Sequence, residues 1–271
     1  MFRTTADEKL GSSPLWKGGL VRRPVLALMI VLLLAASTVV FRGVRRTVVE
    51  HPAAAAALPI AGEPSHLDPA EFTTRIDHPY WPMRPGSRWV YRQTDAGGSR
   101  RIEVTVTHRT RTVMGVQARV VHDVATEDGE VTEDTYDWYA QDADGNVWNL
   151  GEDTRQVEDG KVTSTEGSWQ AGVDGAQPGI LLPARPRPGM AYRQEYGAGA
   201  RDTAAVLSLH QRAKVPSGLF EHVLVTKEFT PLEPKLLKHA FFALGVGPVL
   251  SLTLAGGSDR EELLSFEPAP P

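Results

Sequence analysis

The sequence of 271 residues contains no cysteine. Disulfide bonds, thiolate metal sites, a cysteine nucleophile and lipid attachment at a cysteine are therefore excluded on chemical grounds. The chain also lacks a net positive charge, because its formal net charge is −4. Nucleic-acid binding needs a basic face that replaces the counterions of the phosphates. We therefore expect no nucleic-acid partner.

The sequence also lacks the common signatures of catalysis. It has no Gly-x-Ser-x-Gly elbow, phosphate-binding loop or dinucleotide fingerprint, and its eight histidines are scattered without the spacings of a zinc site. We predict no catalytic residue and no cofactor. One alternative stays open, a carboxylate-dependent envelope hydrolase, assisted by calcium, in which two acidic residues share a cleft. The acids considered are Glu133, Asp137, Asp142, Asp144 and Glu152.

One long uncharged segment lies near the N-terminus. Residues 25–41 read VLALMIVLLLAASTVVF and have arginines on both sides. As a helix this segment covers about 26 Å, close to a hydrocarbon thickness of about 30 Å. We predict a cytoplasmic segment at residues 1–23 and a single-pass signal anchor at residues 24–41, with the rest of the chain in the periplasm or cell envelope. The alternative is a signal peptide cleaved near Ser37, which would give a secreted protein.

The amino-acid composition changes twice after this segment. Residues 42–77 are rich in alanine and proline without sustained periodicity, and are predicted to be a linker. Beyond Tyr80, short runs rich in Val, Thr, Tyr and Trp alternate in polarity and are separated by Gly, Asp-Gly and Pro-Gly. This pattern predicts half-buried antiparallel strands. The predicted fold class is mostly β, an antiparallel sandwich or incomplete barrel preceded by one transmembrane helix.

The β region contains an internal repeat. Arg84-Pro85-Gly86 followed by Trp89-Val90-Tyr91 returns as Arg187-Pro188-Gly189 followed by Ala191-Tyr192. Four such landmarks keep one offset of about 101 to 103 residues, which indicates a duplicated unit. We therefore predict two related β halves. The boundaries are residues 78–166 for the first half, 167–186 for a Gly/Pro-rich connector, 187–266 for the second half and 267–271 for a tail.

The segment Asp142-Ala143-Asp144-Gly145-Asn146 is similar to the start of a calcium loop. An EF-hand loop needs glycine at its sixth position and glutamate at its twelfth, whereas here glycine is fourth and the twelfth position is Asp153. Asp-Gly between alternating segments is a strong hairpin signal, because glycine adopts the positive φ that the turn requires. We predict a turn, with calcium binding at Asp142, Asp144 and Glu152 as the alternative.

Charge is unevenly distributed along the first half. Eleven acidic residues and no Lys or Arg lie between Arg119 and Arg155, whereas the stretch from Arg84 to Arg111 carries seven arginines. We expect cross-strand pairs between these opposite charges, each contributing about 0.2–1 kcal/mol. The alternative is a surface that binds divalent cations or a cationic partner.

Four blocks of sequence stand out: HPYWPMRPGSRWVY at residues 78–91, EDTYDWYAQD at 133–142, TEGSW at 165–169 and KEFTPLEP at 227–234. Together they resemble an uncharacterised family of exported bacterial β-rich proteins, many of which carry a lipoprotein cysteine. Because this chain has none, the membrane helix would supply any anchoring. The resemblance implies an exported compartment and a β fold, and it assigns no catalytic residue.

These features predict a non-enzymatic envelope protein whose β domain binds a ligand or a protein partner. Aromatic side chains suit the lining of an apolar pocket for a hydrophobic ligand such as lipid, and they suit an ordinary core equally. The expected partners are the lipid bilayer, through residues 24–41, and such a ligand or an envelope protein. The candidate pocket residues are Trp89, Tyr91, Trp138, Trp148 and Tyr192.

Overall fold

The computed structural model describes residues 58–60, 65–197 and 201–270. Nearly every element in these ranges is a β-strand, and the strands pair antiparallel in one continuous sheet, which confirms the prediction of a mostly β, antiparallel protein. The predicted anchor at residues 24–41 and the cleavage position near Ser37 lie outside the described residues. None of the helices in the described ranges has the length and hydropathy that crossing a bilayer requires.

Fifteen strands form the sheet, and a short 3-10 helix, η1 (Pro69–Glu71), precedes them. The first strands are β1 (Phe72–Thr73), β2 (Arg88–Thr94), β3 (Ser99–Val113), β4 (Val116–Glu127), β5 (Glu130–Asp142), β6 (Val147–Glu158), β7 (Lys161–Ser164), β8 (Trp169–Gln170) and β9 (Gly179–Leu182). The remaining strands are β10 (Ala191–Arg193), β11 (Thr203–Val215), β12 (Gly218–Phe229), β13 (Leu237–Ala243), β14 (Gly247–Ala255) and β15 (Arg260–Glu267).

The sheet consists of two meanders that share a border. Strands β2 to β7 follow one another in the first meander, and β10 to β15 follow one another in the second. The last strand, β15, pairs antiparallel with β2, so that Phe266 lies opposite Trp89 and the two meanders become one sheet. β1 pairs with β5, whereas β8 and β9 pair with β6.

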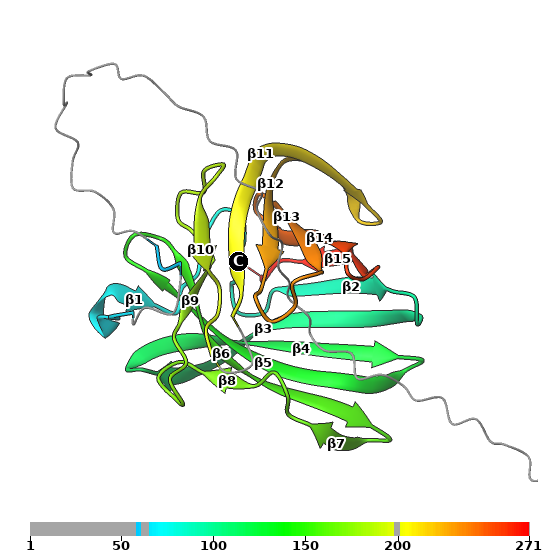
Figure 1. The fold of residues 1–271 in the computed structure, drawn as a ribbon, viewed down its shortest axis with the longest axis horizontal. Helices are drawn as coiled ribbons and strands as arrows, with labels where there is room; N and C mark the ends of the chain where they lie inside the picture. Colours follow the sequence, from blue (N-terminus) through cyan, green and yellow to red (C-terminus); the bar gives the residue numbers. More distant parts are fainter. Residues whose placement is uncertain (1–57, 61–64, 198–200, 271) are drawn as a thin grey trace, which may run out of the picture.

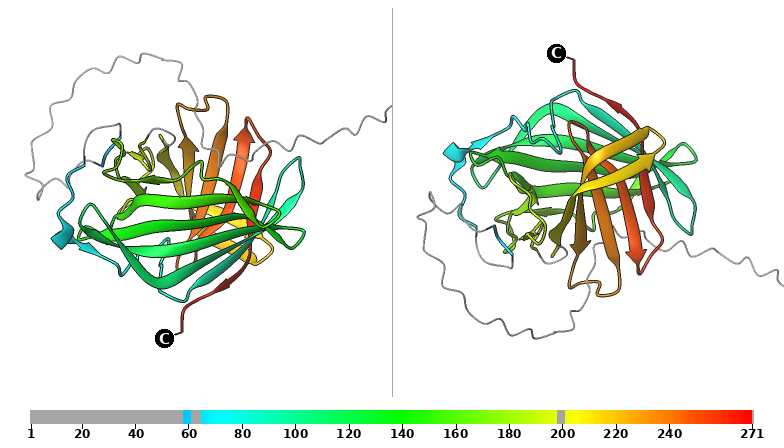
Figure 2. Two further views of the ribbon diagram at one scale, coloured as in Figure 1. Left: turned by 90° about the horizontal axis from the view of Figure 1, so that it is seen from below. Right: turned by 90° about the horizontal axis from the view of Figure 1, so that it is seen from above.

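The sheet curls so that its two meanders pack face to face. In Figure 1 the strands of the first meander, cyan to green, run across those of the second, yellow to red, and Figure 2 shows one meander lying over the other. Such crossing is typical of sheets that pack orthogonally. The main core lies between the meanders and draws on both, with Trp89 and Val121 from the first and Leu224 and Phe242 from the second.

Each meander begins at the same kind of corner, formed by the repeated Arg-Pro-Gly sequence. The N–H of Gly86 donates to the carbonyl of Val106 at 2.8 Å, and the N–H of Gly189 donates to the carbonyl of Val206 at 2.9 Å. In both corners the valine N–H donates in return to the residue after the glycine, at 3.0 and 2.8 Å. Gly86 and Gly189 have φ values of 94° and 87°, a region in which glycine is favoured. The sequence repeat therefore forms a structural repeat at these corners.

A smaller core lies on the outer face of the first meander. It contains Val120, Trp138 and Leu150, and it is packed against Phe72 of β1 and Trp169 of β8. Because successive residues of a strand point to opposite faces, these side chains cannot belong to the main core on the inner face. The outer face thus has an apolar base of its own.

Candidate functional site

Strand β5 carries different chemistry on its two faces. Tyr139 lies in the main core, and by alternation Asp137 shares its inner face. Tyr136 and Trp138 lie on the outer face. The structure therefore presents two candidate sites, which we call the outer hollow and the inner carboxyl group.

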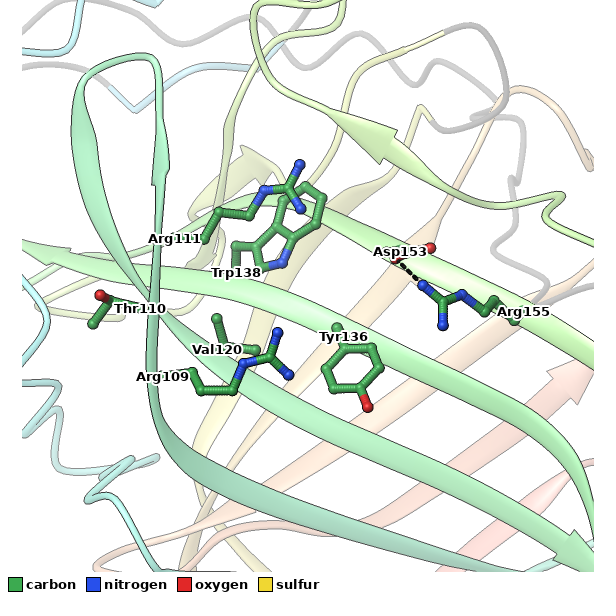
Figure 3. Close-up of a pocket in the computed structure, with 8 residues that line it drawn as sticks. All are labelled: Arg109, Thr110, Arg111, Val120, Tyr136, Trp138, Asp153 and Arg155. Atoms are coloured by element: carbon green, nitrogen blue, oxygen red, sulfur yellow. Dashed lines mark hydrogen bonds and ion pairs between the residues drawn. The ribbon is translucent and has the colours of Figure 1, made fainter.

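The outer hollow lies over β3, β4, β5 and β6 and has a volume of about 360 Å³. In Figure 3 the guanidinium of Arg111 lies along the ring of Trp138, with Arg109 and Tyr136 nearby and Arg155 farther along the face. Three lining side chains are positive and one is negative, a local surplus of two positive charges in a chain of net charge −4. The lining residues are Arg109, Thr110, Arg111, Val120, Tyr136, Trp138, Asp153 and Arg155.

A bulge in β3 shapes one side of the outer hollow. Val106 pairs with Val121, and the next pair along the ladder is Thr110 with Arg119, so that three residues of β3 lie opposite Val120 alone. Bulges of this kind re-aim side chains next to functional sites. In the bulge β3 has two more residues than β4, an even number, so the alternation of faces along β3 is preserved. The arginines on either side of Thr110 therefore both lie on the outer face.

The Arg119 side chain holds this bulge in place. Its Nη1 donates to three successive carbonyls, those of Thr107, His108 and Arg109, at 3.2 to 3.4 Å, and its Nε donates to the carbonyl of Thr74 at 3.4 Å. Burial lowers the pKa of Arg119, although the guanidinium still carries its charge at neutral pH. The bulge interrupts the β3–β4 ladder, and Arg119 supplies donors that these carbonyls would otherwise lack.

The arginines of β3 are positioned by aromatic rings. The guanidinium carbon of Arg111 lies 3.8 Å from the ring centroid of Trp138, and its Nη2 donates to Oε1 of Gln170 at 2.6 Å. Arg109 lies over the ring of Tyr136, 5.3 Å from its centroid. Stacking uses the face of a guanidinium and leaves N–H groups at its edge available to an anion.

Arg155 borders the hollow on β6. Its Nη2 donates to Oδ2 of Asp153 at 2.7 Å, and its Nη1 lies 4.0 Å from Oδ2 of Asp134. Oδ1 of Asp134 is 2.6 Å from Nε2 of His122, whose ring stacks on Tyr136 with 4.3 Å between the centroids. A guanidinium has five N–H donors, so the close pair with Asp153 leaves Arg155 able to bind a further acceptor.

Gly151 allows β8 to approach the hollow. It has a φ of 131°, and a Cβ at this position would lie 2.4 Å from the carbonyl oxygen of Trp169 and 3.0 Å from the ring of Trp138. Gly151 pairs with Gln170, the residue that accepts from Arg111. The absence of a side chain at Gly151 therefore brings the hydrogen-bond partner of Arg111 into position.

The inner carboxyl group lies between the meanders. Asp137 on β5 is opposite Glu152 on β6, and Asp123 on β4 shares their face. Burial raises the pKa of Glu152 to about 7, and burial followed by neighbouring carboxylates raises the pKa of Asp123 and Asp137 well above its ordinary value. Burial also raises the pKa of Asp202, before β11, to about 7. Burial likewise raises the pKa of Glu195, Glu228 and Glu261.

The acids of the inner carboxyl group that were considered for hydrolysis are held by contacts within the sheet. Oε2 of Glu152 accepts from the Thr154 hydroxyl at 2.8 Å. Burial raises the pKa of both Asp137 and Glu152. Glu133, on the same face, accepts from Nε2 of Gln156 at 2.8 Å. Within the described part of the chain, no three His, Asp or Glu side chains are grouped so that they could hold a metal ion.

The remaining acids of the predicted calcium or hydrolase set belong to the turn between β5 and β6. The carboxylate of Asp142 accepts from the N–H and the Nδ2 of Asn146, both at 2.8 Å, and from Nε1 of Trp148 at 2.7 Å. Asp144 is exposed. Gly145 has a φ of 95° and donates to the carbonyl of Asp142 at 3.0 Å, which confirms the predicted hairpin turn. The oxygens of Asp142 thus stabilise the turn.

The five aromatic residues predicted as pocket candidates lie on opposite faces of the sheet. Trp89, Tyr91 and Tyr192 are buried in the main core. Nε1 of Trp89 and the hydroxyl of Tyr91 each donate to a backbone carbonyl, at 2.8 and 3.0 Å. Trp138 packs on the outer face, whereas Trp148 is half-buried and contacts both cores, and of the five only Trp138 lines the outer hollow.

The predicted pairing between the arginines and the acidic run was wrong in its partners. Arg88 and Arg101 pair with Glu103, which lies outside that run, and Arg109 and Arg111 stack on aromatic rings. Several acids of the run lie on the inner face instead. The sequence did contain a signal for the outer hollow, because arginines two residues apart on one strand, and aromatics two apart on another, must share a face.

The comparisons with known proteins give no assignment. No known family model matches the chain, and no curated protein matches it. Among solved structures, a provisionally assigned lipoprotein from Parabacteroides distasonis aligns over 69% of this chain and 98% of its own length, with 11% sequence identity and a TM-score of 0.38. A similarity this low carries no argument about function. The resemblance to an exported family stays a prediction.

Proposed function

We propose that this protein is a non-enzymatic binding protein of the cell envelope and that it holds an anionic ligand in the outer hollow. The observation that carries the proposal is the surplus of two positive charges in a hollow of about 360 Å³. Arginine binds carboxylate and phosphate groups through charge-assisted hydrogen bonds, which are about twice as strong as neutral ones. The ligand is therefore a carboxylate or a phosphate.

Preorganisation supports this assignment. Arg111 is fixed by Trp138 and Gln170, and the backbone that carries Arg109 is fixed by Arg119. Ordering a flexible long side chain when a ligand binds costs about 0.5–1.5 kcal/mol. A side chain that is already ordered before binding avoids most of this cost. Arginines on a flexible surface would bind the same anion more weakly.

The location follows from the uncharged leader. We infer that residues 24–41 anchor the chain in the bilayer with the β domain outside the cytoplasm, because arginines flank this segment and a long folded domain follows it. The alternative, release after cleavage near Ser37, leaves the β domain in the same compartment. Either arrangement exposes the outer hollow to anions of the envelope.

We also infer that the two meanders are related halves of one duplicated unit. The shared corner at Gly86 and Gly189 supports this relation, as does the equal length of β4 and β12, twelve residues each. The strand of the second meander that corresponds to β3 is β11, and it carries Arg212 and Lys214. Arg212 pairs with Glu221 on β12 at 2.8 Å, so its charge is neutralised within the second meander.

The proposal is tested by titrating the full chain with citrate and with inorganic phosphate. We expect the Arg109→Gln/Arg111→Gln double variant to lose about tenfold or more in affinity, since a hydrogen bond to a charged group contributes about 1.5–3 kcal/mol. Raising the salt concentration should weaken binding to the wild type. The matched control is Arg212→Gln, which removes an exposed arginine paired with Glu221 on the second meander. Equal anion binding by the double variant and the control would contradict the proposal.

A further inference from the structure

We propose that the anionic ligand is an acidic glycan strand, and that it lies across the outer hollow and a second hollow beside it. This inference rests on the proposed function and extends it from a binding pocket to a binding groove. The second hollow has a volume of about 280 Å³. It is lined by Arg101, Glu103, Thr105, His122, Val124 and Thr126.

The two hollows lie end to end along β4. Val120 lines the outer hollow, and His122, Val124 and Thr126 line the second. These residues are two apart and so project from the same face of the strand. From Val120 to Thr126 the strand rises about 20 Å, at about 3.3 Å per residue. A groove of this length exceeds a single small anion and matches an extended polymer.

A pair of stacked rings lies where the hollows meet. Tyr136 lines the outer hollow and His122 lines the second, and their planes are 3° from parallel with 4.3 Å between centroids. Arg109 lies over the Tyr136 ring, and Oδ1 of Asp134 is 2.6 Å from Nε2 of His122. The junction therefore combines ring surface with a cation and a carboxylate, which suits a polymer that carries both acidic groups and hydroxyls.

The mixed lining favours a glycan over a polyphosphate. Each hollow combines arginine with a carboxylate, Asp153 in one and Glu103 in the other. A sugar hydroxyl can donate to these carboxylates and to the Thr105 hydroxyl, whereas a phosphate chain has no donors for them. A uronic-acid polymer provides the carboxylates that arginine binds and the hydroxyls that the acids accept.

The position of the groove also disfavours a peptide strand. β4 is paired on one side with β3 and on the other with β5, so its backbone N–H and C=O groups are used within the sheet. An extended peptide gains affinity mainly by adding to a free sheet edge. Recognition on this face must come from side chains, as it does for a polymer of sugars.

The test is a calorimetric titration of the full chain with oligogalacturonic acids of increasing length, from the monosaccharide to the hexasaccharide. Affinity should rise by about tenfold or more up to the tetrasaccharide and then level, because the longer chain reaches Arg101 and gains another charge-assisted contact. Arg101→Gln should remove about tenfold from tetrasaccharide affinity and leave the monosaccharide unchanged. Thr105→Val, which alters a hydroxyl without altering charge, should cost about fivefold in the tetrasaccharide alone. Arg212→Gln again serves as the control.

The outcomes separate the groove from the pocket. If the monosaccharide binds as tightly as the tetrasaccharide, or if Arg101→Gln and Thr105→Val change neither, the groove is refuted while the pocket stands. If polyphosphate binds more tightly than the tetrasaccharide, the glycan assignment is refuted. If the Arg109→Gln/Arg111→Gln variant binds every probe as well as the control does, the pocket and the groove are refuted together.

Discussion

Replacing Glu152 by glutamine is expected to stabilise the folded protein strongly at pH 8 and much less at pH 5. Burial raises the pKa of Glu152 from 4.5 to about 7, so the folded state binds this proton more tightly than the unfolded state does. The free energy of unfolding is therefore highest below pH 4.5, falls as the pH rises toward 7 and stays low above it. This rise in the pKa of Glu152 corresponds to a loss of at most about 3 kcal/mol in the free energy of unfolding, and of less where water reaches the carboxyl.

Glutamine mimics the protonated carboxyl and removes its ionisation. The Thr154 hydroxyl donates to Oε2 of Glu152 at 2.8 Å, and the amide oxygen of glutamine can accept the same bond. Glu152→Gln should therefore raise the free energy of unfolding by up to about 3 kcal/mol at pH 8 and by less than about 1 kcal/mol at pH 5. The matched control is Glu158→Gln, an exposed residue at the end of the same strand, which should change neither value.

The assay is urea unfolding of the full chain, followed by tryptophan fluorescence at both pH values. The comparison uses the difference in free energy of unfolding between variant and wild type, because the ionisation of other groups changes stability with pH in the opposite direction. Burial lowers the pKa of His78, which makes stability rise with pH up to its unfolded value of about 6.5. The pKa of Glu103, lowered by hydrogen bonds from Arg88, matters only below about pH 4.5. An equal effect of Glu152→Gln at pH 5 and pH 8 would refute the reasoning.

Three further changes test the construction of the outer hollow. Arg119→Met should lower the free energy of unfolding by about 2 kcal/mol and weaken anion binding, because the carbonyls of the β3 bulge lose their donor. Urea unfolding and anion titration measure the two effects, and an unchanged anion affinity would contradict the role of the bulge. Gly151→Ala should lower the free energy of unfolding by more than about 3 kcal/mol, since its Cβ would meet the Trp169 carbonyl. Gly160→Ala, with open space around it, should lower it by only about 1 kcal/mol. Similar losses for the two variants in thermal melts would count against the close approach of β8. Asp142→Ala should lower the free energy of unfolding by about 1–3 kcal/mol, because it removes the acceptor of three hydrogen bonds. Millimolar calcium should leave the wild-type melting temperature unchanged. A calcium-dependent rise in melting temperature that this variant abolishes would support calcium binding at the turn instead.

The strands and turns were predictable because they are set by local chemistry. Alternation over residues 102–107 and 117–124 and the Asp-Gly signal at Gly145 are properties of a few neighbouring residues, and β3, β4 and the β5–β6 turn appear where those signals lie. The repeated Arg-Pro-Gly corner was visible for the same reason. A conformation that depends on φ at one glycine needs no knowledge of the rest of the fold.

The faces of the strands were harder to predict. On β5, Asp137 and Tyr139 face inward while Tyr136 and Trp138 face outward, so both faces mix polar and aromatic residues. Hydrophobic alternation identifies the buried face only when one face is clearly more apolar. Periodicity therefore placed Arg109 with Arg111, and Tyr136 with Trp138, on common faces, but it did not show which face of the sheet is the inner one. The β3 bulge was also hidden, because it depends on a contact of Arg119 with the segment before β2 and with the bulge itself.

The positive charge of the outer hollow follows from the unequal lengths of two neighbouring strands. β2 pairs with β3 only as far as Thr105, and within this stretch arginines find carboxylates nearby, as Arg88 does with Glu103 and with Glu267 on β15. β3 continues to Val113, where β4 is its only ladder partner among the described strands. Arginines placed beyond the end of β2 thus escape the cross-strand pairing that neutralises the others. The acidic chain has a cationic hollow because β3 extends past the end of its neighbour β2.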